Sequence, residues 1–348
     1  MSTDAEIVRA LLRCVDHPEH AEELARWPVR VVTDLAAHHR LSPLLGSVGG
    51  GGGGGVSPWP PDLAEIFRRH HRVTLARNIQ LGHALGEVLA AFEAAGIDAL
   101  VLKGLAYDAT LYTRPGSRAT SDIDVLAPRQ HRRGALETLA RLGFAPVATS
   151  PGFDEADYHE VELRRGPTFV DLHFRFVPRE RCAVDYESVW RRAQPLAVEG
   201  QAAARQLAPE HAAAYHALHM AVHHFQVPAI YLVDLRRMLA AGGIAAEAEE
   251  TARRWRCLRP WRTAMAVTAS AHGEAAGAPA CSRADEIAAR LAHVAPLSRP
   301  EQIRRKLTHF DTAGDAARYA FTQGRRRVRE LAERLRGRSP EERLGLTR

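Results

Sequence analysis

Hydrophobic residues recur at helical spacing through the first 45 residues of the chain. Ile7, Leu11 and Val15, for example, are four positions apart, so that they share one face of a helix. Seven consecutive glycines follow, and so dense a glycine run favours neither helix nor strand. The pattern therefore predicts an N-terminal helical region over residues 1–48 and a flexible Gly/Pro-rich linker over residues 49–61.

A long helix and four strands are expected next. The helix begins at Asp62, as its N-cap, and runs to about Ala95, where Gly96 provides a typical C-terminal stop. Four short segments then have the pattern of β-strands, the first of them an apolar run bounded by turn residues. They are IDALVLKG, SDIDVLAP, YHEVELRR and TFVDLHFRF.

Two shorter helices are expected among these strands. The first begins at Gly104, after the first strand, and the second begins near Arg129, after the second strand. From about Arg179 the helical spacing continues to the end of the chain. The sequence therefore predicts an α+β core over residues 62–179 and a C-terminal helical domain over residues 180–348.

Aspartates occur at alternate positions within two of the predicted strands. Because side chains two residues apart in a strand share a face, Asp122 and Asp124 project together, as do Asp171 and His173. If the two strands are neighbours, Asp171 completes a cluster of three carboxylates, which suits Mg²⁺ or Mn²⁺ rather than zinc. An isolated Asp-x-Asp pair is also consistent with a turn or a solvated edge strand. The third aspartate, in the right phase, favours the metal site.

The segment LVLKGLAYDATLY predicts a strand, a Lys-Gly step and a helix. This order points a helix N-terminus, with its free backbone N–H groups, at the same end of the sheet, which is typical of a phosphate site. Gly104 would let a phosphate approach the backbone closely, and Lys103 and Arg118 would compensate the charge of a triphosphate. Lys103 is also one of only two lysines among 47 basic residues.

The segments LKG, RATSDIDVLAP and VDLHFRF, in this order, resemble those of the bacterial uncharacterised nucleotidyltransferase family, which has a polymerase-β-type fold. The downstream helix YHALHMAVHHFQVPAIYLVDLRRM is similar to that family's His-rich segment, which ends in a Leu-Asp step. The resemblance covers about residues 65–240. It implies a mixed sheet with helices and the metal-dependent transfer of a nucleotidyl group.

Carried over residue by residue, the resemblance implies that Asp122, Asp124 and Asp171 are catalytic and bind Mg²⁺ or Mn²⁺, with Asp171 also a candidate base. Nucleotide contacts are expected from Lys103, Gly104, Arg118, Ser121 and His173. One feature departs from the pattern, because the usual Gly-Ser step is Lys103-Gly104 here. This step lies about eighteen residues before the Asp-x-Asp pair rather than about a dozen, which leaves the donor nucleotide open.

The expected function is that of a phosphorus-group transferase. It would move a nucleoside monophosphate from an NTP such as ATP to an unknown acceptor hydroxyl or phosphate, on a small molecule, a peptide or RNA. Two alternatives stay open. One is transfer of another phosphate-linked group in the tailoring of a peptide or small molecule, and the other is a non-catalytic nucleotide-binding sensor or scaffold.

The composition says more about where the protein acts than about which reaction it catalyses. A net charge of +6 suits an acidic ligand without requiring nucleic acid. No apolar run approaches the ~18 residues that span a bilayer, and the acidic N-terminus is a poor signal peptide. The four cysteines form no Cys-x-x-Cys pair. We therefore expect a cytoplasmic protein with no membrane partner.

Two further segments have open roles. His216, His219 and His223 share a helical face, but the glutamate of the His-Glu-x-x-His zinc motif is missing. A cleft-lining or hydrogen-bonded role is therefore favoured over zinc binding. The segment RRRVRELAERLRGR predicts an amphipathic helix with an arginine face, which is either simply solvated or a guide for an acidic acceptor such as RNA.

Overall fold

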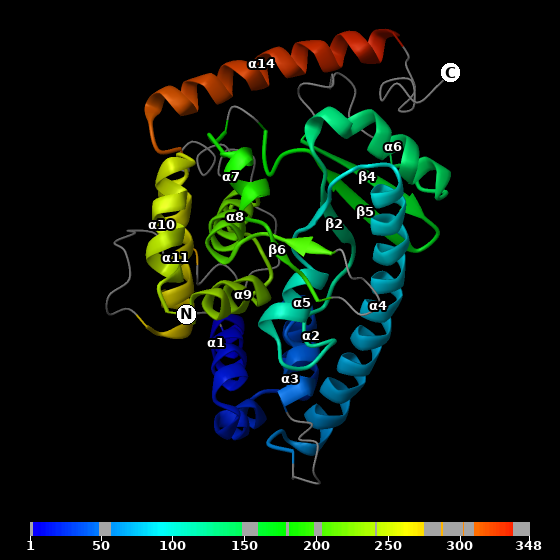
Figure 1. Ribbon diagram of the computed structural model, residues 1–348. Coiled ribbons are helices and arrows are strands. Elements are labelled where there is room, and N and C mark those ends of the chain that lie inside the picture. The colour runs from blue at the N-terminus through cyan, green and yellow to red at the C-terminus, as the bar shows by residue number, and fades with distance from the viewer. Residues whose placement is uncertain are drawn as a thin grey trace.

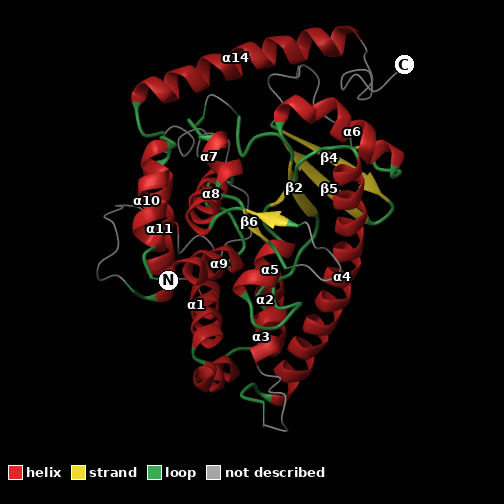
Figure 2. Ribbon diagram, viewed as in Figure 1, coloured by secondary structure: helices red, strands yellow, loops and turns green. Residues whose placement is uncertain are grey.

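A computed structural model describes residues 3–48, 57–147, 159–178, 181–197, 204–240, 242–274 and 310–336, together with Ile287 and Gln302. Helices surround one mixed β-sheet, and the helices of the two ends of the chain pack beside it (Figures 1 and 2). The expected α+β class with helical flanks is therefore confirmed. The glycine run lies outside the described residues.

The N-terminal flank consists of four short helical segments and one long helix. They are α1 (Thr3–Asp16), the 3₁₀ helix η1 (Pro18–Arg26), α2 (Val29–His38), α3 (Ser42–Val48) and α4 (Pro61–Ala94). Trp59, within the predicted linker, is buried, and its indole N–H donates to the carbonyl of Leu45 at 2.9 Å. The described end of that linker is therefore held against the N-terminal helices.

The long helix α4 runs along one side of the molecule, as Figure 1 shows. Its predicted extent is confirmed, and Gly96 follows it with a φ of 67°, in the left-handed region where glycine costs least. The predicted N-cap is wrong by two residues. Pro60 is the N-cap and Pro61 the first helical residue, because the fixed φ of proline suits that position, so Asp62 lies in the first turn.

The described residues form a sheet of seven strands in the order β3-β4-β5-β2-β1-β7-β6. The strands are β1 (Leu100–Val101), β2 (Ile123–Leu126), β3 (Ala145–Pro146), β4 (Glu160–Arg165), β5 (Thr168–His173), β6 (Gln194–Pro195) and β7 (Arg205–Gln206). β2 lies at the centre, parallel to β5 and antiparallel to β1. The expected mixed sheet is therefore confirmed, as are the helices α5 (Leu105–Leu111) and α6 (Arg132–Arg141) that follow β1 and β2.

The expectation of purely helical structure after Arg179 is wrong at one point. β6 and β7 return to the sheet, where β7 pairs in parallel with β1 and antiparallel with β6. Each of these strands has only two residues, so neither is long enough to show the alternation that identifies a strand in a sequence. The domain boundaries themselves stay a prediction.

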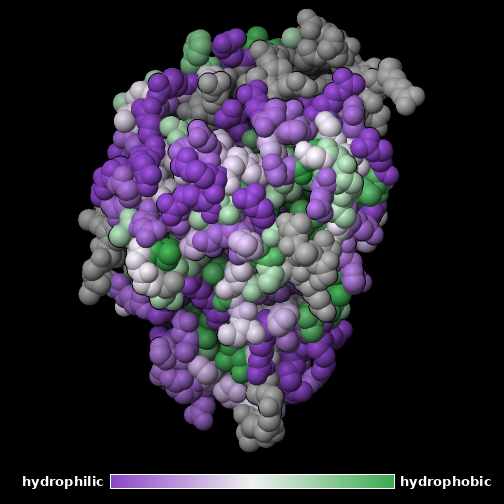
Figure 3. Space-filling model, viewed as in Figure 1, coloured by the Kyte–Doolittle hydropathy of each residue, from purple (hydrophilic) through white to green (hydrophobic). Residues whose placement is uncertain are grey.

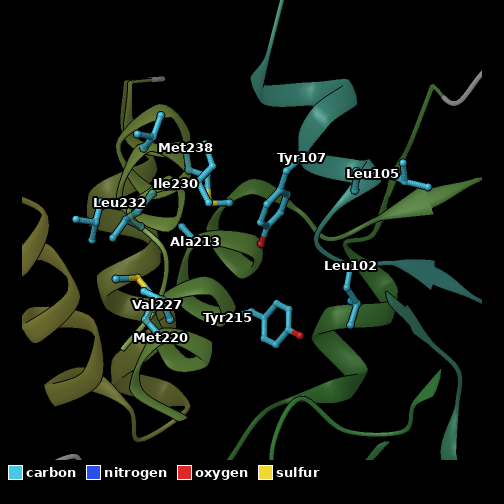
Figure 4. Close-up of a cluster of buried hydrophobic side chains, with 14 of the residues drawn as sticks. Leu102, Leu105, Tyr107, Ala213, Tyr215, Met220, Val227, Ile230, Leu232 and Met238 are labelled. Atoms are coloured by element: carbon cyan, nitrogen blue, oxygen red, sulfur yellow. The ribbon is translucent and has the colours of Figure 1, made fainter. Parts of the chain in front are cut away.

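The C-terminal flank packs its helices beside the sheet and across its end. They are α7 (Tyr186–Arg191), α8 (Pro209–Val222), α9 (Ile230–Leu239), α10 (Ile244–Arg254), α11 (Leu258–His272) and α14 (Ala313–Arg336). The described part of the predicted arginine-rich helix belongs to α14, which crosses one end of the molecule in Figure 1. Hydrophobic side chains of α5, α8 and α9 form part of the core that joins this flank to the sheet (Figure 4).

Hydrophilic residues dominate the face seen in Figure 3, with hydrophobic residues in scattered patches. None of the helices in the described part of the chain combines the length and the apolarity needed to cross a membrane.

A buried ion pair ties α9 to the loop before β2. Both Nε and Nη2 of Arg118 donate to one oxygen of Asp234, at 3.2 and 3.0 Å, and Tyr112 donates its hydroxyl to the other oxygen at 2.6 Å. Asp108 of α5 holds the same loop by accepting hydrogen bonds from the backbone N–H groups of Gly116 and Arg118. These two aspartates fix the segment that leads into the strand carrying Asp122 and Asp124.

Replacing Asp234 should destabilise the fold strongly. Asp234→Asn keeps the side-chain shape but leaves the Arg118 guanidinium charged and uncompensated in the interior, at a cost of about 3–5 kcal/mol in the free energy of unfolding. Glu137→Gln, which removes one partner of an exposed pair, should cost less than about 1 kcal/mol. Urea denaturation measures both, and equal losses would contradict the role given to this ion pair.

Candidate active site

The parallel pairing of β2 and β5 places two aspartates side by side. Asp124 and Asp171 are directly paired residues of the two strands, and Asp122 lies just before β2 begins. Potential ligand atoms of Asp124, Asp171 and His173 all lie within 4.8 Å of one another. The structure therefore brings together two of the three expected metal ligands and adds His173 to them.

Asp124 is the most deeply buried of these acids. Its Oδ1 lies 2.9 Å from Nζ of Lys103 and 3.1 Å from Nε2 of His173. Burial alone would raise the pKa of Asp124, but the Lys103 ammonium and the His173 imidazole outweigh it and hold the pKa well below its usual range. Asp124 is therefore a permanently ionised carboxylate with two positive neighbours.

Asp171 and Asp122 lack such close compensation. Burial and the negative charge of Asp124 raise the pKa of Asp171 to about 7, although His173 partly opposes them. The same two causes raise the pKa of Asp122, to which Ser121 donates a side-chain hydrogen bond. Three carboxyl groups thus lie close together, but the positive side chains of Lys103 and His173 directly contact only one of them, Asp124.

His173 joins the central carboxylate to a second acid. Burial disfavours its charged form, but the hydrogen bond to Asp124 and the charge of Glu160 raise the pKa of His173 above its ordinary value. Oε2 of Glu160 lies 3.3 Å from Nδ1 of His173, on the neighbouring strand. Sequence reasoning missed Glu160, because its position opposite His173 depends on the register of β4 with β5.

Lys103 and Gly104 lie where β1 ends and α5 begins. Lys103 is buried, and its ammonium is confined between Asp124 and the ring of Tyr215, whose centroid is 6.0 Å away. Gly104 has a φ of 50°, and a Cβ there would lie 2.8 Å from Cγ2 of Thr120. The backbone conformation and the close approach to Thr120 both require glycine at this position.

Arg118, by contrast, uses its guanidinium within the fold. It is almost wholly buried and bonds Asp234 and the carbonyl of Ala119 rather than one of the clustered acids. Its expected contact with a nucleotide stays a prediction. Asp234, near the end of the His-rich segment, was a signal in the sequence, but its bonded partner was not.

Two tyrosines that sequence reasoning missed approach the same region. Tyr107 of α5 and Tyr215 of α8 lie between these two helices (Figure 4), and both hydroxyls are buried without a hydrogen-bond partner among the described residues. Burial, with the charge of Asp124, raises the pKa of Tyr215, so the hydroxyl stays protonated. A buried hydroxyl without a partner beside Lys103 is available to a bound ligand.

The His-rich helix packs on α9. Nε2 of His216 lies 2.8 Å from the carbonyl oxygen of Tyr231, and the ring of His219 stacks on the Tyr231 ring at 5.6 Å. Burial lowers the pKa of both histidines, so they are neutral at physiological pH. This arrangement agrees with the favoured hydrogen-bonded role within the helical flank.

The donor set fits a divalent cation. Carboxylate oxygens from Asp124 and Asp171 are the ligands that Mg²⁺ and Mn²⁺ prefer, and Asp122 stands at the start of the same strand. The pKa values of Asp122 and Asp171 are raised because these carboxyl groups are buried and lie near the negative charge of Asp124. A bound cation would relieve that repulsion. Asp122 as a direct ligand stays a prediction.

A protein-family model described as "Uncharacterised nucleotidyltransferase" matches residues 28–272, more than half of the chain. The chain belongs to this nucleotidyltransferase family. The match includes both aspartate-bearing strands and the His-rich helix, so the resemblance drawn from those segments is confirmed. No curated protein matches this nucleotidyltransferase.

Two solved structures of ANT(2'')-Ia have a distant likeness to this nucleotidyltransferase. The solution structure of that antibiotic-resistance factor is 17% identical and covers 51% of this chain and 94% of its own, with a TM-score of 0.35. The crystal structure of ANT(2'')-Ia with adenylyl-2''-tobramycin is 16% identical and covers 50% and 97%, with a TM-score of 0.36. At this identity and TM-score, neither structure decides the acceptor of this chain.

The stability of the cation-free nucleotidyltransferase should depend on the ionisation of Asp171. In the unfolded chain an aspartate ionises near pH 4, whereas the pKa of Asp171 in the folded chain is about 7. The folded state therefore holds this proton more tightly, and its stability falls as the pH rises from about 4 to about 7. Asp171→Asn removes that dependence.

With a chelator present, Asp171→Asn should gain at least about 1.4 kcal/mol of unfolding free energy over the original chain between pH 5 and pH 8, the equivalent of one pKa unit. Urea denaturation at the two pH values measures this gain. Asp98→Asn, at an exposed position, is the control and should show no such change. A difference between Asp171→Asn and the original chain that is the same at both pH values would contradict the raised pKa.

Proposed function

We propose that this nucleotidyltransferase transfers a nucleoside monophosphate from an NTP to an acceptor hydroxyl or phosphate, with Mg²⁺ or Mn²⁺ as its cofactor. The observation that supports this most is the pairing of Asp124 with Asp171 on parallel strands, with Asp122 at the start of one of them. A protein that only binds a nucleotide has no need of three clustered acids at the centre of its sheet.

Asp122, Asp124 and Asp171 are the residues that would hold the cation. When bound, a divalent cation supplies Lewis-acid stabilisation of the charge on a triphosphate. Asp124 stays ionised in the cation-free protein, because Lys103 and His173 compensate it, so this ligand is available at any physiological pH. His173 holds the Asp124 carboxylate in place through Nε2.

Lys103 and Gly104 are proposed to face the phosphates of the donor. Leu102 donates its backbone N–H to the carbonyl of Asp124 at 3.0 Å, so the Lys-Gly step begins beside the aspartate-bearing strand. The Lys103 ammonium is already next to the carboxylates, and it is a compact charge on a flexible stem that can reach a phosphate oxygen. The unpartnered hydroxyl of Tyr215 can donate to the same ligand.

In the transfer, an acceptor oxygen forms a bond to the α-phosphorus of the NTP. The bond from that phosphorus to its bridging oxygen breaks, and pyrophosphate leaves with the bonding electron pair. If the acceptor is a hydroxyl, its proton passes to the carboxylate of Asp171, the candidate general base. A phosphate acceptor needs no such base.

Replacing any one of the three acids should abolish most of the activity. Asp122→Asn, Asp124→Asn and Asp171→Asn should each lower cation-dependent pyrophosphate release at least about 100-fold, and double variants should lose little more, because the acids act as a unit. The assay screens all four NTPs with Mg²⁺ or Mn²⁺ and follows mass shifts in acceptor mixtures. Asp98→Asn is the matched control. Near-normal turnover in one variant, with folding checked by circular dichroism, would remove that residue from the site.

Lys103 should not tolerate arginine. The ammonium occupies a confined space between Asp124 and Tyr215, and a planar guanidinium needs more room. Lys103→Arg should therefore weaken NTP binding about tenfold although the charge is kept, and Lys103→Met should weaken it further. Calorimetric titration with a non-hydrolysable NTP measures this, with the exposed Arg133→Lys as control. If Lys103→Arg binds as well as the original chain, Lys103 has no specific role at the phosphates.

A further inference from the structure

A cavity of about 880 Å³ lies beyond the carboxyl ends of β2 and β5. Arg129 and Arg175, which follow these two strands, form one wall. The other wall comes from the C-terminal flank, with Cys182 before α7, Arg256 before α11 and Arg318 in α14. In Figure 1 this is the end of the molecule that α14 crosses.

The lining of this cavity is strongly basic. Among the residues that the structure describes, it contains four arginines and one acid, Asp315. Asp315 is already shared, because it forms ion pairs with both Arg256 and Arg318 and accepts a hydrogen bond from Thr312. On the opposite wall Arg129 is exposed, and no carboxylate of the described residues pairs with it. Arg129 therefore presents its positive charge to the cavity.

Bonds between distant segments hold the flank side of the cavity in place. Asp311 accepts from the backbone N–H groups of Leu258 and Arg259, at 2.8 and 2.7 Å, and so fixes the start of α14 to the start of α11. Ala183 donates its backbone N–H to the carbonyl of Trp255 at 2.8 Å, which ties the Cys182 segment to the same place. The backbone that carries the basic lining on this side is therefore held in place by the fold.

The cavity and the Lys-Gly step lie toward opposite ends of β2. Arg175 comes two residues after His173, and Arg129 comes five residues after Asp124, a backbone span of at most roughly 16 Å. β1 is antiparallel to β2, so Lys103 lies toward the amino end of β2, where Asp122 is found. Along the strands, Asp124 and Asp171 therefore lie between the backbone of the Lys-Gly step and the arginines.

This order along the strand suits an in-line transfer, in which the entering and leaving oxygens lie on opposite sides of the phosphorus. We propose that the basic cavity is the acceptor subsite, and that the acceptor is a small molecule bearing at least two phosphate groups. The proposal rests on the proposed function. Arginine is the side chain best suited to bind phosphate through paired N–H groups, and a polyamine acceptor would be repelled by the same lining.

The volume of the cavity favours a small molecule over a macromolecule. Sites of roughly 300–1,000 Å³ enclose ligands of drug size, and about 880 Å³ falls within this range. A bisphosphorylated sugar is small enough to enter such a cavity and carries the required charge. Its free hydroxyls are the kind of acceptor group that the transfer needs.

The test measures binding of fructose 1,6-bisphosphate to the full chain by calorimetry, without NTP and with a chelator present. Arg129→Gln should weaken this binding about tenfold, whereas Arg133→Gln, which removes the same charge from an exposed site on α6, should leave it unchanged. Fructose and spermidine are the uncharged and polycationic comparison ligands. Neither should bind.

Cys182 supplies a second readout inside the cavity. It is half-buried in the lining, whereas Cys14 and Cys257 are fully buried. The bisphosphate should therefore slow alkylation of Cys182 by iodoacetamide several-fold, as followed by mass spectrometry of its peptide. This readout separates the cavity from the Lys103 site, at which none of the three described cysteines is found.

Absence of bisphosphate binding, an equal loss in Arg129→Gln and Arg133→Gln, or binding that leaves Cys182 unprotected would each overturn the proposal. Tight binding of an RNA oligonucleotide with none of the bisphosphate would replace it with a nucleic-acid surface. Because no NTP or cation is present, these results are independent of turnover. If the bisphosphate does not bind but cation-dependent pyrophosphate release is observed, the acceptor proposal fails and the proposed function stands.

Discussion

The burial of Asp124 at the centre of the sheet is the constraint on which the rest of the site depends. An ionised carboxylate in the interior needs positive partners, and Lys103 and His173 supply them at 2.9 and 3.1 Å. Lys103 is therefore confined at the end of β1, and His173 is fixed on β5. The parallel register then places Asp171 beside Asp124 with no partner of its own, which is why its pKa rises to about 7.

The helical flank contributes to this site through a second buried charge. Asp234 of α9 neutralises Arg118, whose backbone N–H is in turn held by Asp108 of α5. This chain of contacts fixes the segment that leads into β2, while Tyr215 of α8 approaches Lys103. The flank is thus part of the site's construction, and the family match, which extends to residue 272, includes α8 and α9.

The local patterns of the sequence were sufficient for the elements that carry the acids. The alternation in SDIDVLAP and TFVDLHFRF placed Asp124 and Asp171 correctly in phase, and Gly96 marked the end of the long helix. What the sequence could not show is pairing between distant segments. The ion pair of Arg118 with Asp234, the place of Glu160 opposite His173 and the return of β7 to the sheet all depend on tertiary contacts or register, and two-residue strands carry no readable period.

The central claim is that Asp124 and Asp171 hold a divalent cation, and that the Lys103 ammonium then leaves Asp124 for a phosphate oxygen of the NTP. Its most direct test is a crystal structure of the protein with Mn²⁺ and a non-hydrolysable NTP, using the anomalous scattering of manganese to locate the ion. The account predicts an anomalous peak bound by Asp124 and Asp171, with the Lys103 ammonium moved from Asp124 to a phosphate oxygen. A bound nucleotide with no manganese at these aspartates, and with Lys103 still on Asp124, would contradict it.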